Sequence, residues 1–159
     1  MKHRTTALLA AGLAIAFGTL SFATHAQQAP KPETLIKSRQ SAFQLVAYQS
    51  SRIKASLDGT YNKDEVARAA GTIAAIANSG LGSLFPAGTE QGKGWGDTKV
   101  KPEFFKDSKR ANELTAEFAH EASELAKVAQ AGDAAAVKAQ YAKLNRTCKA
   151  CHDDFRNKD

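Results

Sequence analysis

The chain has 159 residues, 43% of them hydrophobic, and a formal net charge of +6 at pH 7. This length is enough for one domain with its own apolar core and too short for several. The basic side chains are spread along the sequence and do not form a run, so the charge gives no case for nucleic-acid binding and is interpreted as favouring solubility.

The first predicted element is a secretory leader in residues 1–26. Lys2 and Arg4 form a basic start, residues 6–20 are almost wholly apolar or small, and small residues precede the expected cleavage after residue 26. A retained membrane anchor is the alternative, but the apolar stretch is shorter than the roughly 20 residues that a helical span needs. Because the leader holds two basic and no acidic residues, cleavage leaves a domain of residues 27–159 with a charge of about +4. Export would deliver this domain to an oxidising compartment, the periplasm.

Helical periodicity of apolar residues predicts four long helices in the rest of the chain. The first is expected over about 32–57 and the second over about 62–80, ended by Gly59 and Gly80. Arg39 falls on the apolar stripe of the first helix, where a charge is costly unless it is paired. Small residues along the second helix would permit close approach of another helix or of a second subunit.

A glycine-rich connection over 81–101 follows the second helix. Connections this long are unusual in a compact domain. Because it contains Phe85 and Trp95, we expect it to be packed. A third helix is predicted over about 103–130, and its apolar stripe leaves His120 on the opposite, solvent-facing side.

The last helix is predicted over about 134–157, which completes an all-α, antiparallel four-helix bundle. Near its end, Cys148, Cys151 and His152 form a C-x-x-C-H run, which is typical of c-type haem attachment through two thioethers, with the imidazole as iron ligand. The run uses both cysteines of the chain. Three alternatives each lack part of their pattern: a thioredoxin-like redox pair needs a preceding β-strand, a zinc site needs about four ligands, and a disulfide across two residues would be strained.

The group that binds the iron on the side opposite His152 distinguishes an electron-transfer cytochrome from a gas-binding one. Electron-transfer cytochromes often use methionine there, but the only methionine is Met1, which is lost with the leader. His120 is expected to face solvent, and lysine or tyrosine ligation stays open. The simplest interpretation is a five-coordinate iron in the bundle interior whose apolar distal side binds small gases. A haem propionate is then the expected partner of Arg39, with a guanidinium that reaches out to water as the alternative.

These features together resemble the cytochrome c′ family, whose members are periplasmic, high-spin four-helix bundles and usually dimers. The resemblance covers nearly the whole chain after the leader, and three motifs carry it. They are the C-terminal run from Cys148 to Arg156, the first-helix run Arg39-Gln40-Ser41-Ala42-Phe43, and, in the connection, Phe85, Gly88-Thr89-Glu90 and Lys101-Pro102-Glu103-Phe104-Phe105.

The resemblance implies one haem c per chain, bonded to Cys148 and Cys151 and ligated by His152. Phe43 matches the family position whose bulky side chain blocks the distal face, so carbon monoxide binding there is expected to be hindered. Arg156 matches the basic residue near the proximal face, where family members bind nitric oxide; a charge that contacts the carbonyls at its own helix end is the alternative. The residues expected around the haem are Arg39, Gln40, Phe43, Thr89, Glu90, Phe105, Phe118 and Arg156.

Two functions follow from these expectations. The favoured one is a periplasmic haem protein, not an enzyme, that captures small gases such as carbon monoxide and, above all, nitric oxide. The alternative is a periplasmic electron-transfer cytochrome, and a non-haem helical binding protein would apply if no haem were attached. A homodimer through the first two helices is expected, the redox partner is unknown, and neither nucleic acid nor a membrane is expected as a partner of the cleaved protein.

Overall fold

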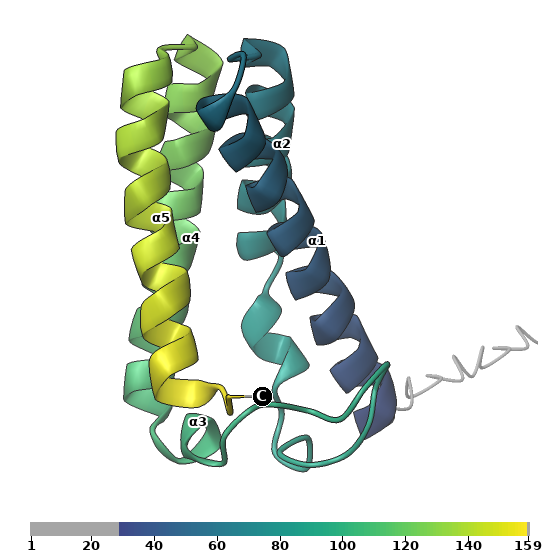
Figure 1. The fold of residues 1–159 in the computed structure, drawn as a ribbon. Helices are drawn as coiled ribbons and strands as arrows, with labels where there is room; N and C mark the ends of the chain where they lie inside the picture. Colours follow the sequence, from purple (N-terminus) through teal and green to yellow (C-terminus); the bar gives the residue numbers. More distant parts are fainter. Residues whose placement is uncertain (1–28, 159) are drawn as a thin grey trace, which may run out of the picture.

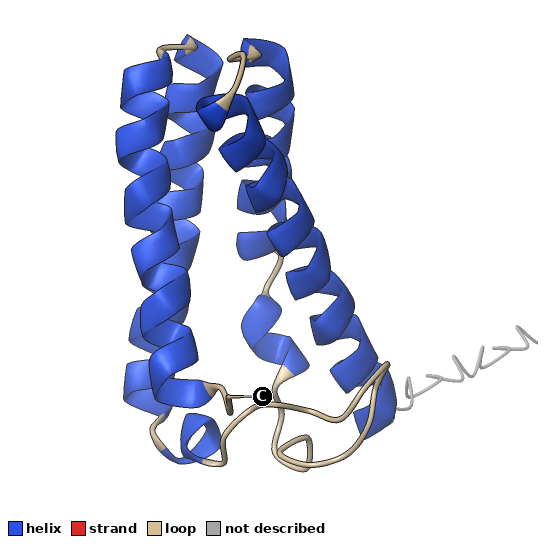
Figure 2. Cartoon of the chain, viewed as in Figure 1, coloured by secondary structure: helices blue, strands red, loops and turns tan. Residues whose placement is uncertain are grey.

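The computed structural model describes residues 29–158, in which four long helices run alternately up and down (Figure 1). These helices are α1 (Pro32–Asp58), α2 (Lys63–Ala77), α4 (Ser108–Ala131) and α5 (Ala134–Phe155). The connection between α2 and α4 contains two short elements, η1 (Leu81–Leu84) and α3 (Glu103–Lys106). Within the described residues no β-strand forms, only isolated bridges (Figure 2). The predicted all-α, antiparallel four-helix bundle is confirmed.

Capping residues explain where two of the long helices begin. The Asn62 side chain accepts a hydrogen bond from the backbone N–H of Glu65 at the start of α2. Asp133 accepts from the first backbone N–H groups of α5. Just before it, Gly132 has a φ of 89°, in the left-handed region that glycine adopts at little cost. These turns are short, so α1 and α2, and likewise α4 and α5, are antiparallel neighbours.

Two expected helix boundaries are wrong. The helix expected over 103–130 is broken at Asp107, which leaves the helical conformation and accepts a hydrogen bond from the N–H of Arg110 at the start of α4. The helix expected to stop at Gly80 already ends at Ala77, and Gly80, with a φ of 83°, precedes η1. In both places a local capping preference overrides the longer apolar period.

The main apolar core fills the half of the bundle that contains the two short turns. Fully buried side chains from all four long helices meet there, among them Ile53, Val66, Leu125 and Val137. Burying a side chain of this size stabilises the fold by about 1.5–3 kcal/mol. The small buried Ala69 and Ala70 allow α2 to lie close to its neighbours. We call this region the closed half.

Toward the other end, α1 and α5 diverge (Figure 1). A smaller core of Ala111, Leu114 and Phe155 joins α4 to α5 there. Earlier on α5, the Tyr141 hydroxyl hydrogen-bonds that of Ser50 at 2.8 Å and joins α5 to α1. The long connection between α2 and α4 crosses this end of the molecule (Figure 2). We call this region the cavity half.

The connection was expected to be packed, and this is confirmed for Phe85 but wrong for Trp95. Phe85 packs against Phe104 with 4.6 Å between ring centroids. Trp95, however, is 69% exposed, because its ring lies on the outside of α1, where its Nε1–H donates to the Ser41 hydroxyl at 2.8 Å. The hydrogen bond holds the indole in place without burying it.

None of the helices in residues 29–158 is long and apolar enough to cross a bilayer. The leader expected in residues 1–26 lies outside the described residues.

Candidate functional site

A cavity of about 610 Å³ lies between α1 and α5 in the cavity half. This volume is within the roughly 300–1,000 Å³ of pockets that bind small molecules and cofactors. Its lining is mostly apolar and comes from α1, α2, α4, α5 and the connection; the large apolar members are Phe43, Val46, Ile73, Leu81, Phe85, Val100, Phe104, Leu114, Phe118, Leu144 and Phe155. The cavity is therefore an apolar space shared by elements that are far apart in the sequence.

Cys148, Cys151 and His152 all line this cavity from α5. The two cysteines lie three residues apart on one helix, which places both sulfurs on the same side. Burial raises the pKa of both free thiols. Catalytic redox cysteines have a lowered pKa instead, so the thioredoxin-like alternative is not supported.

His152 is exposed overall, but its side chain takes part in the cavity wall. Burial lowers its pKa, and the positive charge of Arg156 lowers it further. Both effects favour the neutral imidazole, which is the form that binds a metal ion. The electrostatic surroundings of His152 thus suit an iron ligand.

These residues fit a covalently bound haem. Protein interiors are normally packed as densely as organic crystals, so a cavity of about 610 Å³ beside two cysteines marks space for a prosthetic group. The two thiols would form thioethers with it, His152 would bind its iron, and the apolar lining would exclude water from its faces.

Arg39 is only 2% exposed, so the alternative that its guanidinium reaches out to water is wrong. Its Nη1 donates to the Thr89 hydroxyl at 2.8 Å, and its Nη2 donates to the Thr89 carbonyl and the Thr98 hydroxyl, both at 2.7 Å. The guanidinium also lies 4.7 Å from the ring centroid of Phe85. Burial lowers the pKa of Arg39, and the negative charge of Glu90 opposes this shift. Arg39 therefore joins α1 to the connection while it lines the cavity.

The structure brings four more of the residues expected at the site to the same cavity: Gln40, Phe43, Phe118 and Arg156. Phe43 is 40% exposed, which places it at the edge of the space and not deep inside it. Arg156 is held by an isolated bridge to Val100, which fixes the end of α5 to the connection.

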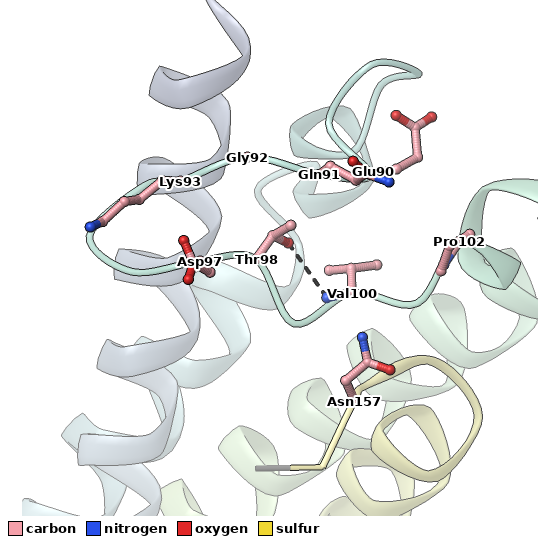
Figure 3. A pocket seen from close by; sticks show the side chains of 9 residues that line it. All are labelled: Glu90, Gln91, Gly92, Lys93, Asp97, Thr98, Val100, Pro102 and Asn157. Atoms are coloured by element: carbon pink, nitrogen blue, oxygen red, sulfur yellow. Dashed lines mark hydrogen bonds between the residues drawn. The ribbon is translucent and has the colours of Figure 1, made fainter.

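Thr89, Glu90 and Phe105 do not line the cavity. Thr89 is a hydrogen-bonding partner of Arg39. Glu90 lies on a second, outer hollow of about 390 Å³ (Figure 3). Phe105 packs on Phe104 with 5.5 Å between ring centroids, and it is Phe104 that takes part in the cavity wall.

Sequence reasoning missed Phe104 and Thr98 as residues of the site. α3 has four residues, too few for helical periodicity to tell which of two adjacent phenylalanines points inward. Thr98 contacts Arg39 across 59 positions of sequence. The only available signal was that a buried arginine needs partners, which does not say where they are.

A helical bundle with a C-x-x-C-H run on the wall of an apolar cavity defines a c-type cytochrome. The family model described as Cytochrome C' matches residues 34–156. Cytochrome c′ from Rhodocyclus tenuis is 62% identical over 130 residues, which are 81% of this chain and 98% of that protein. Cytochrome c′ from Allochromatium vinosum is 41% identical over 158 residues, 99% of this chain and 100% of that protein. The chain therefore belongs to the cytochrome c′ family.

Solved structures agree with this assignment. One is a cytochrome c′ with an unusual ligand-controlled dimer dissociation; it has a TM-score of 0.79 and 41% identity, over 81% of this chain and 98% of that chain. Another is a nitric oxide complex of a variant of cytochrome c prime from Alcaligenes xylosoxidans, with a TM-score of 0.71 and 27% identity, over 80% of this chain and 98% of that chain. The protein is thus a haem-binding c-type cytochrome of the four-helix type.

Proposed function

We propose that this protein captures nitric oxide in the periplasm, to buffer or remove it, at one five-coordinate haem c per chain. The bound haem would supply an iron able to take a diatomic ligand. The composition of the cavity wall supports this proposal: among the described lining residues, His152 is the single histidine, there is no methionine or tyrosine, and Lys99 is the one lysine. His120, the other histidine of the described chain, is exposed on α4 and lies outside the wall.

The two sides of the cavity support different roles. On the α1 side, Phe43 places a bulky ring 6.3 Å from that of Phe85, and an aromatic ring there raises the steric cost of a ligand. On the α5 side, Arg156 follows His152 by one helical turn and donates its backbone N–H to the His152 carbonyl at 3.0 Å. A cationic side chain there would stabilise the partial negative charge that a diatomic ligand gains on a ferrous iron.

Absorption spectra of the ferrous holoprotein, with and without nitric oxide and carbon monoxide, test the proposal. The expected result is a high-spin spectrum without added gas and a clear change with nitric oxide. A low-spin, six-coordinate spectrum in the absence of any gas would overturn it, because a second protein ligand would then occupy the iron.

Replacing Phe43 by alanine tests the steric part of the proposal. Carbon monoxide affinity is expected to rise about tenfold, which corresponds to roughly 1.4 kcal/mol. Trp95→Ala is the matched control, since it also removes an aromatic ring but at an exposed position outside the cavity wall. An unchanged affinity in Phe43→Ala would mean that Phe43 does not lie over the iron.

We also propose that residues 1–26 are a cleaved leader and that residues 27–159 form the exported domain. The attachment motif supports this, because c-type haem is bound outside the cytoplasm. Intact-mass spectrometry of the periplasmic fraction is expected to show a chain that starts at residue 27 and carries the mass of one haem. A mass without haem would contradict the assignment of Cys148, Cys151 and His152 as a haem attachment site.

A homodimer through α1 and α2 is the proposed assembly. Leu45 and Tyr48, 43% and 57% exposed, place large apolar side chains on the outside of α1, where a second subunit would bury them. Sedimentation velocity tests this with Leu45→Glu combined with Tyr48→Glu, which is expected to give monomers. Ala116→Glu with Gln130→Glu, at exposed positions of α4, is the control and should leave the dimer intact.

A further inference from the structure

The outer side of α5 has an unbalanced charge. From residue 134 to residue 152 the helix has no acidic residue, and its four basic residues are all exposed. These four residues, which we call the basic face, are Lys138, Lys143, Arg146 and Lys149. α4, its direct neighbour, contains three basic and four acidic residues and is nearly balanced. The cations are therefore gathered over residues 138–149, whereas Asp153 and Asp154 in the last turn reduce the net charge of the whole helix to +2.

Ion pairing within the chain explains little of the basic face, although Lys143 is near enough to Glu124 on α4 to help lower the pKa of that carboxyl group. In the part of the chain that the structure describes, Lys138, Lys143 and Arg146 form no ion pair, whereas Lys149 pairs with Asp153. Cations are favourable in the last turn of a helix, but Lys138 and Lys143 lie in its first half. Like charges three residues apart, such as Lys143 and Arg146, slightly destabilise a helix.

The position of the basic face is also informative. At 100° per residue, Lys138 and Lys149 fall about 20° and 40° from Asn145, both on the same side of it, and Asn145 is exposed and lines the cavity. Lys149 lies between the two attachment cysteines, Cys148 and Cys151. A protein bound to this face would therefore lie within about one helix diameter, roughly 10 Å, of the cavity.

We propose that the basic face docks an acidic one-electron carrier protein that reduces the haem. One electron leaves the reduced carrier, which is oxidised, and converts ferric iron to ferrous iron; no bond or proton needs to be transferred. Opposite charges would steer the encounter and orient the carrier. The proposal rests on the haem assignment and is independent of nitric oxide as the ligand.

The residues between the cations favour a protein partner. Ala135, Ala139 and Ala142 are exposed on the same side of α5, and such small side chains allow a protein surface to approach closely. A membrane-binding helix would instead present large apolar side chains to the acyl chains, and a single-stranded nucleic acid would be bound by aromatic rings that stack on its bases.

The test uses the ferric holoprotein and a reduced, acidic [2Fe–2S] ferredoxin as the probe carrier, mixed in a stopped-flow instrument at low ionic strength. The test variant is Lys143→Glu with Arg146→Glu. The matched control is Lys93→Glu with Lys106→Glu, two exposed positions outside α1, α2 and the cavity wall, which changes the net charge by the same amount. The second-order reduction rate constant is expected to fall about tenfold in the test variant and less than about threefold in the control. Equal slowing of both variants would overturn the proposal, because long-range attraction alone would explain it.

A second measurement does not depend on electron transfer. Carbodiimide treatment of the mixed proteins joins ferredoxin carboxylates to lysines, and peptide mass spectrometry should map these cross-links to Lys138, Lys143 and Lys149. Cross-links concentrated on α2 or on Lys93 would overturn the proposal. So would sedimentation with phosphatidylglycerol vesicles that is lost in Lys143→Glu with Arg146→Glu but retained in the control, because the face would then bind a membrane.

Failure of this proposal and failure of the gas-binding proposal are distinguishable. The test variant is expected to keep the ferrous spectra of the unchanged protein with and without nitric oxide, since neither Lys143 nor Arg146 lines the cavity. A six-coordinate ferrous haem would remove the gas-binding proposal and leave the docking result to stand. Exposed substitutions of this kind change stability by only about 0.5 kcal/mol, which thermal unfolding can check.

Discussion

The closed half and the cavity half are built from the same four helices but are stabilised by different interactions. In the closed half, apolar side chains such as Ile53 and Leu125 meet from all sides and are fully buried. In the cavity half, α1 is joined to the connection by the buried Arg39 and its hydroxyl and carbonyl partners. The packed core of the closed half holds the four helices together, so the cavity half can keep an apolar space open.

The two halves should therefore respond differently to the same kind of change. A region with few buried contacts opens locally at a smaller free energy than the one that global unfolding needs. Haem would fill the apolar space and add its own contacts. Damage to the haem site is expected to loosen the cavity half first, and damage to the main core is expected to unfold both halves.

The largest effect is expected from Cys148→Ala combined with Cys151→Ala. Without the two sulfurs no thioether can form, so mass spectrometry of the denatured protein should show no bound haem. Hydrogen exchange should become faster in the cavity half and change less around Leu125. The control is Lys149→Ala, which leaves the attachment residues intact and should keep the haem. Haem that stays covalently bound in the double variant would contradict the assignment of the motif.

Leu125→Ala is the strongest single change expected in the closed half. Leu125 is 0% exposed, and such a truncation leaves a cavity that costs about 2–5 kcal/mol of unfolding free energy. Denaturant unfolding followed by circular dichroism measures this loss. Gln130→Ala, at an exposed position of the same helix, should change it by no more than about 0.5 kcal/mol. Similar losses in both variants would mean that the core is not where the structure has it.

Arg39→Met tests the polar link of the cavity half. It leaves the partner groups of Thr89 and Thr98 without their donor, which is expected to cost about 1–3 kcal/mol. Hydrogen exchange should accelerate in residues 84–98 while the closed half keeps its protection. The control is Lys37→Met, which removes only a cation–π contact with Trp95 at 5.3 Å. Uniform acceleration across the bundle would show that the two halves are not separate.

Asp133→Ala is expected to have the smallest of these effects. The Asp133 carboxylate accepts hydrogen bonds from the N–H groups of Ala135 and Ala136 at 2.8 and 3.0 Å, and loss of such a cap costs about 1 kcal/mol. The change should lower the unfolding free energy without altering the haem spectrum, because the turn lies at the end of the molecule away from the cavity (Figure 1). Asn112→Ala, at an exposed position inside α4, is the control and should be nearly neutral.

Much of the fold could be predicted because its signals are local. Apolar spacing indicated the four long helices, and Asn62 and Asp133 mark two starts through side-chain oxygens that reach their own first turns. The break at Asp107 was missed, although it uses the same kind of cap. There the apolar period continues on both sides, so the pattern by itself favoured one helix.

Some residues of the candidate site could likewise be predicted from local signals, and others could not. By itself the sequence predicted the attachment chemistry and the iron ligand His152, and it showed that no methionine follows Met1, because these depend on residue identity and on spacing along one helix. Only the tertiary structure decided that Arg39 is held by Thr89 and Thr98, that Phe104 lines the cavity, and that Trp95 lies exposed on α1. Those features depend on how the connection crosses the end of the bundle, and its contacts span about 50 or more positions of sequence, a distance over which no local periodicity carries information.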